Sequence, residues 1–484
     1  MDETVRTGSD WQVALSPARA AAREASARAA RGRQPRPPSR QEQAQHVARL
    51  LLDRKVAAVA VTFVDTSGIT RVKGVPVRAF ERAAVWGIGA TPVFDAFGSD
   101  DSIADTPVAN PAGDLRLLPD LDRVVALHAQ PGWAWSPADR LTQDKQPHPG
   151  CSRLLAARLA GQLADAGLTA RAAFEVEWVL YRDGQPATSG PAYGMARLVE
   201  VADFSVDLVR ALAAQGVEVA QFHPEYAPGQ FELSVTAEAP VAAADTAVLV
   251  RTTVRAVAAR HGLEVSFAPA VAEGGVGNGG HLHLSFDRDG TNLFSGGDRR
   301  FGLTGEAESF IAGVLERLPA LLAVGAPSVA SYLRLVPSHW AGAYACWGLE
   351  NREAALRLVT GSAGEEDRAA NIELKCADQA ANPYLLVAAV LAAGMAGMHG
   401  GARLPEPVQV NPATLSDAER AARGVDRLPT ALSDAVDAFA ADSVLSGAFG
   451  AELTETLIAV RRAEIARFAG ADPGRIIAAT RWVY

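Results

Sequence analysis

The chain has 484 residues, which is long enough for a large core and, on length alone, for two or three domains. Its 46 lysine and arginine residues against 55 aspartate and glutamate residues give a net charge of −9, which excludes the basic footprint of a nucleic-acid-binding protein. The three cysteines are far apart and form no Cys-x-x-Cys pair, so we expect a reduced, cytoplasmic protein without structural zinc.

The first part of the chain predicts a tail followed by a small domain. Residues 1–40 are rich in alanine, arginine and proline and have few large apolar side chains, so we expect a disordered tail. Its arginines fit a solvated tail, which we favour, or a contact with an acidic partner. An amphipathic helix is predicted from Gln41 to about Arg54. Residues 59–64 and 72–77 then predict a hairpin around the turn Asp65–Gly68.

A proline-containing segment, residues 146–150, marks the predicted domain boundary and divides residues 41–148 from residues 149–484. The second part opens with a helical period over residues 151–167 and contains the longest apolar run, Tyr384–Met398. That run is too short to span a bilayer comfortably and predicts a buried core helix. The N-terminus has no charged-then-apolar signal arrangement, so we expect no membrane association.

Two carboxylates stand two residues apart in the apolar run Arg171–Tyr181. Because successive side chains of a strand point to opposite faces, Glu175 and Glu177 share one face and the apolar side chains share the other. Two anions on one half-buried face repel each other and lose hydration, which is costly without a cation between them. Three later segments repeat the pattern with Glu232 and Ser234, with His281, His283 and Ser285, and with Glu373 and Lys375.

These strands predict a polar, charge-lined cavity that holds metal for an anionic substrate. The candidate ligands are carboxylates and imidazoles: Glu175, Glu177, Glu225, Glu232, His281, His283 and Glu373. Any one of them alone fits the solvent-facing side of an amphipathic strand, but the whole set, with its flanking glycine and proline turns, favours a site. Oxygen-rich ligation with only one or two histidines suits magnesium or manganese rather than zinc.

Five ordered segments resemble the catalytic domain of glutamine synthetases: residues 174–177, 223–232, 277–285, 351–357 and 372–385. Each segment is weak alone, but the ordered set is specific and spans most of the chain beyond residue 150. Residues 63–68 also resemble the strand of the family's N-terminal domain that carries a catalytic aspartate. The resemblance implies an α+β fold, in which a small N-terminal β-grasp-like domain precedes a large catalytic domain whose curved antiparallel sheet forms a metal-lined funnel.

The resemblance also implies ATP and two or more Mg²⁺ (or Mn²⁺) ions as cofactors. One ion would lie beside the substrate glutamate and the acceptor amine, held by Glu177, Glu225 and Glu232. The second would lie against the nucleotide's phosphates, held by Glu175, His281 and Glu373. Phosphoryl transfer to a carboxylate brings two anions together, and paired metals with arginines cancel the repulsion.

The other site residues follow from the same resemblance. Arg334 matches the arginine that holds the substrate's carboxylate, and Asp65 matches a catalytic aspartate that reaches into the neighbouring subunit's site. The alternative for Asp65 is an ordinary turn role, and the alternative for the phosphate-binding arginines is a surface salt bridge. The nucleotide and phosphate positions are His283, Ser285, Arg352 and Arg357, and Gly277 is a further substrate position.

Departures from the family fall mainly on the acceptor side. Trp340 stands where ammonia-using members carry the glutamate of a flap that binds and deprotonates ammonium, and an indole cannot accept a proton. Lys375 and Asn371 replace arginines, and Val276 replaces an asparagine. The stretch after Leu404 has no tyrosine where enterobacterial-type enzymes are adenylylated.

The predicted activity joins the γ-carboxylate of glutamate to an amine through a γ-glutamyl phosphate. We favour an organic amine (ethanolamine, a polyamine, an alkylamine or hydrazine), with Trp340 as an apolar wall and Lys375 at the substrate. The alternative for Trp340 is a core residue on a displaced flap, with Glu350 or Glu353 in the ammonium chemistry. The alternative functions are an ammonia-using glutamine synthetase and a non-catalytic structural or regulatory homologue. The resemblance further implies a homododecamer of two stacked hexameric rings with active sites between subunits.

Overall fold

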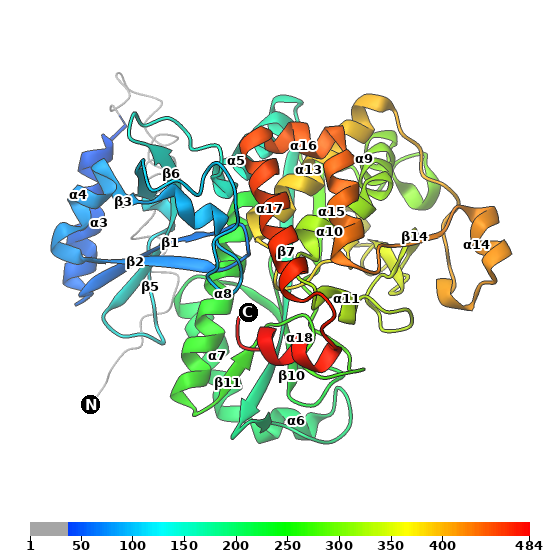
Figure 1. Cartoon of the computed structure of the whole chain (residues 1–484), viewed down its shortest axis with the longest axis horizontal. Helices are drawn as coiled ribbons and strands as arrows, with labels where there is room; N and C mark the ends of the chain where they lie inside the picture. The colour runs from blue at the N-terminus through cyan, green and yellow to red at the C-terminus, as the bar shows by residue number, and fades with distance from the viewer. Residues whose placement is uncertain (1–36) are drawn as a thin grey trace.

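A computed structural model describes residues 37–484 (Figure 1). The predicted disordered tail therefore lies almost wholly outside the described residues. The first described helix, α3 (Arg40–Asp53), begins after Ser39, which forms a capping box with Glu42. This confirms the amphipathic helix predicted from Gln41, and its buried face consists of Ala44, Val47 and Leu51.

A small mixed sheet forms the N-terminal domain, with strand order β2-β1-β6-β4-β3 and β5 paired to β6. The predicted hairpin is confirmed, because β1 (Ala58–Val64) and β2 (Thr70–Pro76) are antiparallel. β2 ends one residue earlier than predicted, because α4 (Val77–Trp86) begins directly after Pro76. The other strands are β3 (Ile88–Ala90), β4 (Leu115–Pro119), β5 (Val125–Ala126) and β6 (Trp133–Thr142).

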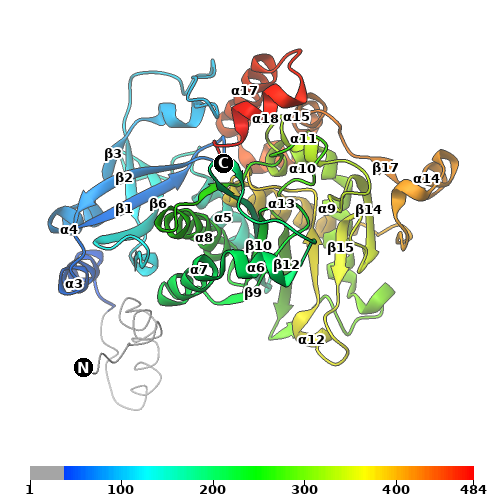
Figure 2. The ribbon, with the colours of Figure 1, turned by 90° about the horizontal axis from the view of Figure 1, so that it is seen from below.

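A curled 11-stranded sheet forms the centre of the rest of the chain (Figure 2). Its order is β17-β14-β15-β16-β12-β7-β10-β9, with β11 and β8 on β7 and β13 on β12. Every pairing is antiparallel except that of β14 with β15, which confirms the predicted curved sheet. The strands are β7 (Thr169–Arg182), β8 (Gln185–Pro186), β9 (Val219–Pro224), β10 (Gln230–Val235), β11 (Glu264–Ser266), β12 (Leu282–Arg288), β13 (Thr291–Asn292), β14 (Tyr344–Leu349), β15 (Ala354–Val359), β16 (Asn371–Leu374) and β17 (Asp426–Arg427).

Helices cover this sheet, and most of them come from the second half of the chain (Figure 1). The early ones are α5 (Ser152–Asp165), α6 (Met195–Glu200), α7 (Ala202–Ala214) and α8 (Pro240–Arg260). The later ones are α9 (Gly305–Glu316), α10 (Leu318–Gly325), α11 (Ser331–Arg334), α12 (Glu366–Ala369), α13 (Pro383–Gly400), α14 (Asp417–Arg423), α15 (Leu432–Ala441), α16 (Ser443–Phe449), α17 (Ala451–Arg467) and α18 (Pro473–Thr480). Short 3-10 helices occupy Pro92–Ala96, Leu121–Arg123, Arg300–Gly302 and Pro412–Thr414.

Helix α13 is the core helix predicted from the apolar run. All of its residues from Pro383 to Gly394 are buried. It packs against α9 at glycines, since a Cβ on Gly397 would lie 2.6 Å from the Cα of Gly313. Among the described helices, α13 is long and apolar enough to cross a membrane, as is the bent pair α16–α17 if it is counted as one span. However, 72% of the α13 window is buried inside the protein, as in a core helix.

The β1–β2 turn packs directly against the large unit. A Cβ at Gly68, whose φ is +80°, would lie 2.0 Å from the carbonyl oxygen of Ala380. Asn382 donates hydrogen bonds to the carbonyls of Val64 and Asp65, and Arg461 donates one to the carbonyl of Thr66. The chain passes from one unit to the other between β6 and α5, and the boundary at residues 148 and 149 stays a prediction.

The packing of this turn gives a stability prediction. We expect Gly68→Ala to lower the melting temperature by several degrees more than Gly132→Ala. Both glycines have positive φ, +80° and +86°, but nothing lies within 4 Å of a Cβ at Gly132. The two substitutions share a backbone cost of about 1 kcal/mol, and only Gly68→Ala adds a clash with backbone. Thermal and denaturant unfolding would measure the difference, and equal effects would contradict a tight contact at Gly68.

Candidate active site

The polar faces predicted for separate strands meet on one face of the large sheet. β7 lies between β10 and β12, and β12 lies beside β16. In register, Glu232 on β10 is opposite Glu177 on β7, and His283 on β12 is opposite Glu373 on β16. Antiparallel partners on one face have neighbouring side chains, so the sheet order itself assembles the site.

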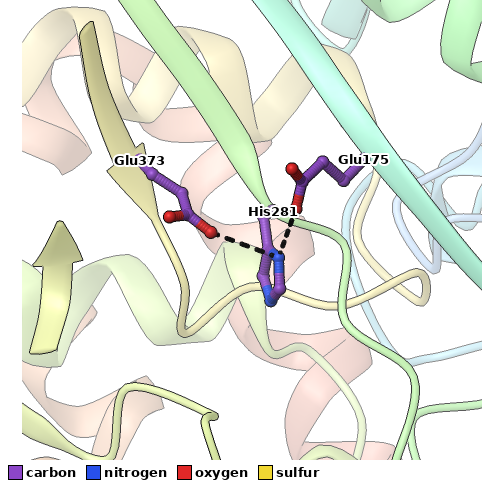
Figure 3. Close-up of side chains that lie close together, drawn as sticks. All are labelled: Glu175, His281 and Glu373. Carbon is purple, nitrogen blue, oxygen red and sulfur yellow. Dashed lines mark hydrogen bonds and ion pairs between the residues drawn. The ribbon is translucent and has the colours of Figure 1, made fainter. Parts of the chain in front are cut away.

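One cluster joins Glu175, His281 and Glu373 (Figure 3). The Nδ1 atom of His281 lies 2.8 Å from Glu175 Oε2 and 3.4 Å from Glu373 Oε1. Each residue offers one ligand atom, and these atoms all lie within 4.8 Å of one another. Two carboxylates and one imidazole suit magnesium or manganese, so these residues fit the ion expected beside the nucleotide.

A second set of groups carries the remaining carboxylates. Glu177 and Glu232 form a potential ligand group with His281, whereas Glu225 and Glu232 form one with His223. The expected trio of Glu177, Glu225 and Glu232 is therefore not a single compact group in the structure, and Glu232 belongs to both groups. Glu225 directly follows β9, and its carboxylate lies beside the ring of His223.

Sequence reasoning did not include His223 among the ligands. Its two ring nitrogens each lie 3.5 Å from a carboxylate oxygen, one of Glu225 and one of Glu232. The sequence did contain one signal for His223. It stands two residues before Glu225, so the strand alternation of β9 places both side chains on the same face. The deciding fact is the cross-strand pairing of His223 with Glu232, which depends on sheet register.

The carboxylates of Glu177 and Glu232 are poorly neutralised. Burial, reinforced by Glu232 and Glu225, raises the pKa of Glu177 to about 8, although Arg334 opposes the shift. Burial also raises the pKa of Glu232 to about 7. Like charges buried together disfavour ionisation, and a divalent cation would reverse that preference.

The carboxylate of Glu373 is paired with cations of this chain. Burial opposes the charge of Glu373, but Lys375, His283 and His281 outweigh it and lower its pKa to about 2. The Lys375 ammonium donates a hydrogen bond of 3.0 Å to Glu373 and is buried. The structure thus places Lys375, predicted at the substrate, against a metal-cluster carboxylate.

Arg334 is buried beside His281 and has one free donor group. Its Nη2 lies 3.2 Å from His281 Nε2 and donates to the carbonyl of Lys375 at 3.2 Å. Its buried Nη1 has no hydrogen-bond partner in the described part of the chain. A buried guanidinium with an unused donor is suited to an anionic ligand.

Glycines allow the chain to approach this arginine. A Cβ at Gly277, one of the predicted substrate positions, would lie 1.9 Å from the carbonyl oxygen of Pro269 and 3.0 Å from Arg334 Cβ. A Cβ at Gly279 would lie 2.6 Å from Glu177 Oε1 and 2.9 Å from Arg334 Nη2. Gly279, which the sequence reasoning did not single out, therefore lies closer to the functional groups than Gly277.

The predicted phosphate arginines have different environments. Arg357 bridges Glu350 and Glu373, with its Nη1 atom 3.1 Å from Glu373 Oε2, so it contacts the site rather than a surface partner alone. Arg352 is exposed, lines a cavity of about 340 Å³, and forms no ion pair within residues 37–484. His283 lies 3.1 Å from Glu175, and Ser285 follows it on the same face of β12.

Asp65 is not at the metal clusters of its own chain. Its carboxylate is fully buried, 2.7 Å from Arg71, and it accepts a hydrogen bond from the amide of Ile69. Burial raises its pKa to about 6, although Arg71 opposes the shift. The structure therefore shows the turn role. The role in a neighbouring subunit's site stays a prediction, and it requires the carboxylate to leave Arg71 and become exposed.

Trp340 is not a core residue, because 43% of it is exposed. Its ring lies 5.1 Å from that of Tyr226, the residue after Glu225. Its amide donates a hydrogen bond of 3.0 Å to Glu353, which is buried. The structure thus excludes the core alternative for Trp340, and its role at the acceptor stays a prediction.

Two metal-ligating groups beside a free arginine donor suit phosphoryl transfer to a carboxylate, which is the chemistry of an ATP-dependent carbon–nitrogen ligase. Residues 45–151 match the glutamine synthetase N-terminal domain, and residues 149–473 match the glutamine synthetase catalytic domain. The chain belongs to the glutamine synthetase family, as its ordered segments predicted.

Known relatives extend over nearly the whole chain. It is 57% identical to the gamma-glutamylpolyamine synthetase GlnA3 of Streptomyces coelicolor over 92% of this chain and 98% of that protein. It is 32% identical to the glutamine synthetase of Halobacterium salinarum over 84% of this chain and 89% of that protein. A crystal structure of a novel glutamine synthase homolog superposes with a TM-score of 0.81 at 35% identity, covering 89% of this chain and 99% of that one. The GmaS/ADP complex superposes with a TM-score of 0.78 at 28% identity, covering 88% and 97%.

The charge imbalance gives a prediction for the metal-free protein. Protonated Glu177 makes its full contribution to folding stability below its ordinary pKa near 4.5. This contribution is lost as the pH rises toward the folded-state pKa of about 8. Glu232, His223 and His283, whose pKa values are also raised, change stability in the same direction. We therefore expect the melting temperature to fall between about pH 6 and about pH 8, and Mg²⁺ to raise it more at the higher pH.

Calorimetry of Glu177→Gln would test the assignment. The amide keeps an oxygen that can accept the hydrogen bond from Gln230 but removes the charge. The variant should show a flatter pH profile and a smaller Mg²⁺ shift than wild type. The control is Glu218→Gln, at an exposed glutamate. A Glu177→Gln profile that matches wild type would show that Glu177 takes no part in the cation site.

Proposed function

We propose that this ligase uses ATP and two or more Mg²⁺ (or Mn²⁺) ions to join the γ-carboxylate of glutamate to an organic amine. When bound, the ions supply charge cancellation between the phosphates and the acceptor carboxylate. Arg334 holds the glutamate through its free Nη1, and Arg352 with Arg357 holds the transferred phosphate. His283 and Ser285 lie on the nucleotide side. The γ-glutamyl phosphate formed in this way is then attacked by a neutral amine, which yields the amide and releases phosphate.

The observation that carries the choice of acceptor is Trp340. The residue that stands at the family's flap glutamate is an exposed indole, and it lies against Tyr226 beside Glu225. An indole offers apolar contact and an aromatic face for a cation, but it has no group that accepts a proton. The 57% identity to a gamma-glutamylpolyamine synthetase supports the same choice and favours a polyamine among the organic amines.

Assembly and location belong to the same proposal. We expect a cytoplasmic homododecamer of two stacked hexameric rings, with each active site completed at a subunit boundary. Light scattering and electron microscopy of the purified protein would test the assembly. A monomer that retains full activity would contradict a site shared between subunits.

An amine panel tests the function. We expect phosphate release, with glutamate and ATP present, to be at least about tenfold more efficient in kcat/KM with a polyamine than with ammonia, the scale of apolar discrimination in a pocket. The panel would contain ammonia, methylamine, ethanolamine, putrescine, spermidine and hydrazine, and Glu373→Ala is the inactive control. Preference for ammonia would indicate a glutamine synthetase. Silence on every amine, despite ATP binding, would indicate a non-catalytic homologue.

Arg334 gives a prediction for the acid substrate. Arg334→Gln should raise the KM for glutamate by about 30-fold or more, because hydrogen bonds to charged groups contribute about 2 kcal/mol or more. The KM for ATP should change little. Steady-state kinetics with each substrate varied separately would measure both constants, and the KM for ATP serves as the control. A parallel rise in both constants would indicate a damaged fold rather than a lost substrate contact.

A further inference from the structure

Two aromatic side chains from distant parts of the chain meet at the acceptor side of the site. The rings of Tyr226 and Trp340 have centroids 5.1 Å apart and planes inclined by 57°. The two residues are nevertheless 46% and 43% exposed. Tyr226 is tied to the carboxylates, since its amide donates a 2.9 Å hydrogen bond to Glu225 Oε2. Exposed aromatic faces beside carboxylates attract alkyl chains and ammonium groups.

The backbone that presents Trp340 is held in an unusual conformation. Ser338 and Trp340 both have positive φ, +63° and +53°, a conformation that residues other than glycine rarely adopt unless contacts support it. The support at Trp340 is Glu353, whose carboxylate accepts the Trp340 amide at 3.0 Å. Glu353 itself is held where its amide donates to Asn351.

One arginine closes the base of this flap. Arg427 on β17 donates hydrogen bonds to the carbonyls of both Leu335 and Ala343, the residues on either side of the segment 336–342. The side-chain amide of Asn411 also donates a hydrogen bond to the hydroxyl of Ser338. The segment is therefore fixed at both ends and at its middle, and the position of the indole is set by the fold.

A cavity of about 340 Å³ is lined by Trp340 and by residues 349–353 and 409–411. Its apolar lining includes Leu349 and Val410, and its carboxylates are Glu350 and Glu353. Glu350 already has a cation, because Arg357 lies 2.5 Å from it. Glu353 forms no ion pair with any cation in the described chain, although it is buried. Arg352 also faces the cavity, and under the proposed function its charge is matched by phosphate.

We infer that Tyr226, Trp340 and Glu353 form an acceptor subsite for a diamine or polyamine. The aromatic pair holds the alkyl chain, and Glu353 both positions Trp340 and attracts the ammonium group at the far end of the chain. This inference rests on the proposed function, because it assigns the amine within that reaction. A single-carbon amine that reacts near Glu225 has no chain to lie along the indole and no second charge for Glu353.

Pairs of amines separate the two parts of the subsite. n-Butylamine and methylamine differ in chain length, so the ratio of their kcat/KM values reports the aromatic contact. Putrescine and n-butylamine differ by one ammonium group, so their ratio reports the distal charge. If an amine is not turned over, its inhibition constant against putrescine replaces kcat/KM.

We expect Tyr226→Ala and Trp340→Ala to lower the n-butylamine to methylamine ratio by about tenfold, the scale of lost apolar contact in a pocket. Tyr226→Phe and Trp340→Phe keep a ring and should retain most of the ratio. The matched control is Trp482→Ala. Trp482 is 48% exposed and packs edge to face on a tyrosine, Tyr181, with the two ring centroids 5.2 Å apart, but it contacts neither Tyr226 nor Trp340 through its ring. Glu353→Gln keeps an acceptor for the Trp340 amide and should lower the putrescine to n-butylamine ratio by about five- to tenfold.

The outcomes distinguish this inference from the proposed function. If wild type uses no organic amine, the proposed function fails and the subsite fails with it. If wild type uses organic amines but each variant changes both members of a pair by the same factor, the subsite alone is wrong. Circular dichroism and the KM for ATP show whether a variant is folded, and the ring-retaining variants supply the test if an alanine variant is not.

Discussion

The large sheet places like charges directly opposite each other, and the rest of the site depends on this constraint. Glu177 and Glu232 are cross-strand partners on β7 and β10, at positions where opposed like charges destabilise a pair. The reverse faces of the same strands carry Trp178 and Leu233 into the core, so neither carboxylate can turn away. The hydrophobic packing of the sheet thereby holds two anions in a buried position that a divalent cation can stabilise.

The two halves of the site meet this constraint differently. Glu373 is accompanied by Lys375 and Arg357, and Glu175 by His281 and His283. The pKa values of both carboxylates are lowered, so they are ionised without metal, and a bound ion would compete with the Lys375 ammonium and the Arg357 guanidinium for Glu373. Burial and the neighbouring carboxylates raise the pKa of Glu177, and Arg334 opposes this shift only in part. The pair Glu177 and Glu232 therefore depends more strongly on a bound cation.

The surroundings of Trp340 support the proposal that the acceptor differs while the fold is unchanged. The backbone amide of Trp340 donates a hydrogen bond to Glu353, so this buried carboxylate holds the backbone of the flap. The indole then stands beside Tyr226, where it adds apolar surface next to Glu225. The potential metal-binding groups are formed by other residues. Under the proposed function, specificity for the amine is therefore separate from the activation of glutamate.

Several features of this protein were determined by local sequence. The period of two in residues 171–181 determined that Glu175 and Glu177 share a face, because alternation is a property of the strand itself. The apolar run of α13 determined a core helix, and the turn residues at Asp65–Gly68 determined a hairpin. The ordered family segments determined the reaction class, since each carries ligands at its own spacing.

Only the tertiary structure decided which of these faces meet and which become buried. His223 joins Glu232 through sheet register, and Tyr226 meets Trp340 through the path of the flap, so neither contact could be read from spacing. The turn residues around Asp65 did not show that this side chain is buried, which follows from packing of the turn against Ala380 and Asn382. The reason is that sequence periodicity assigns a side chain to a face of its own element, whereas strand order, register and domain packing depend on contacts between distant segments.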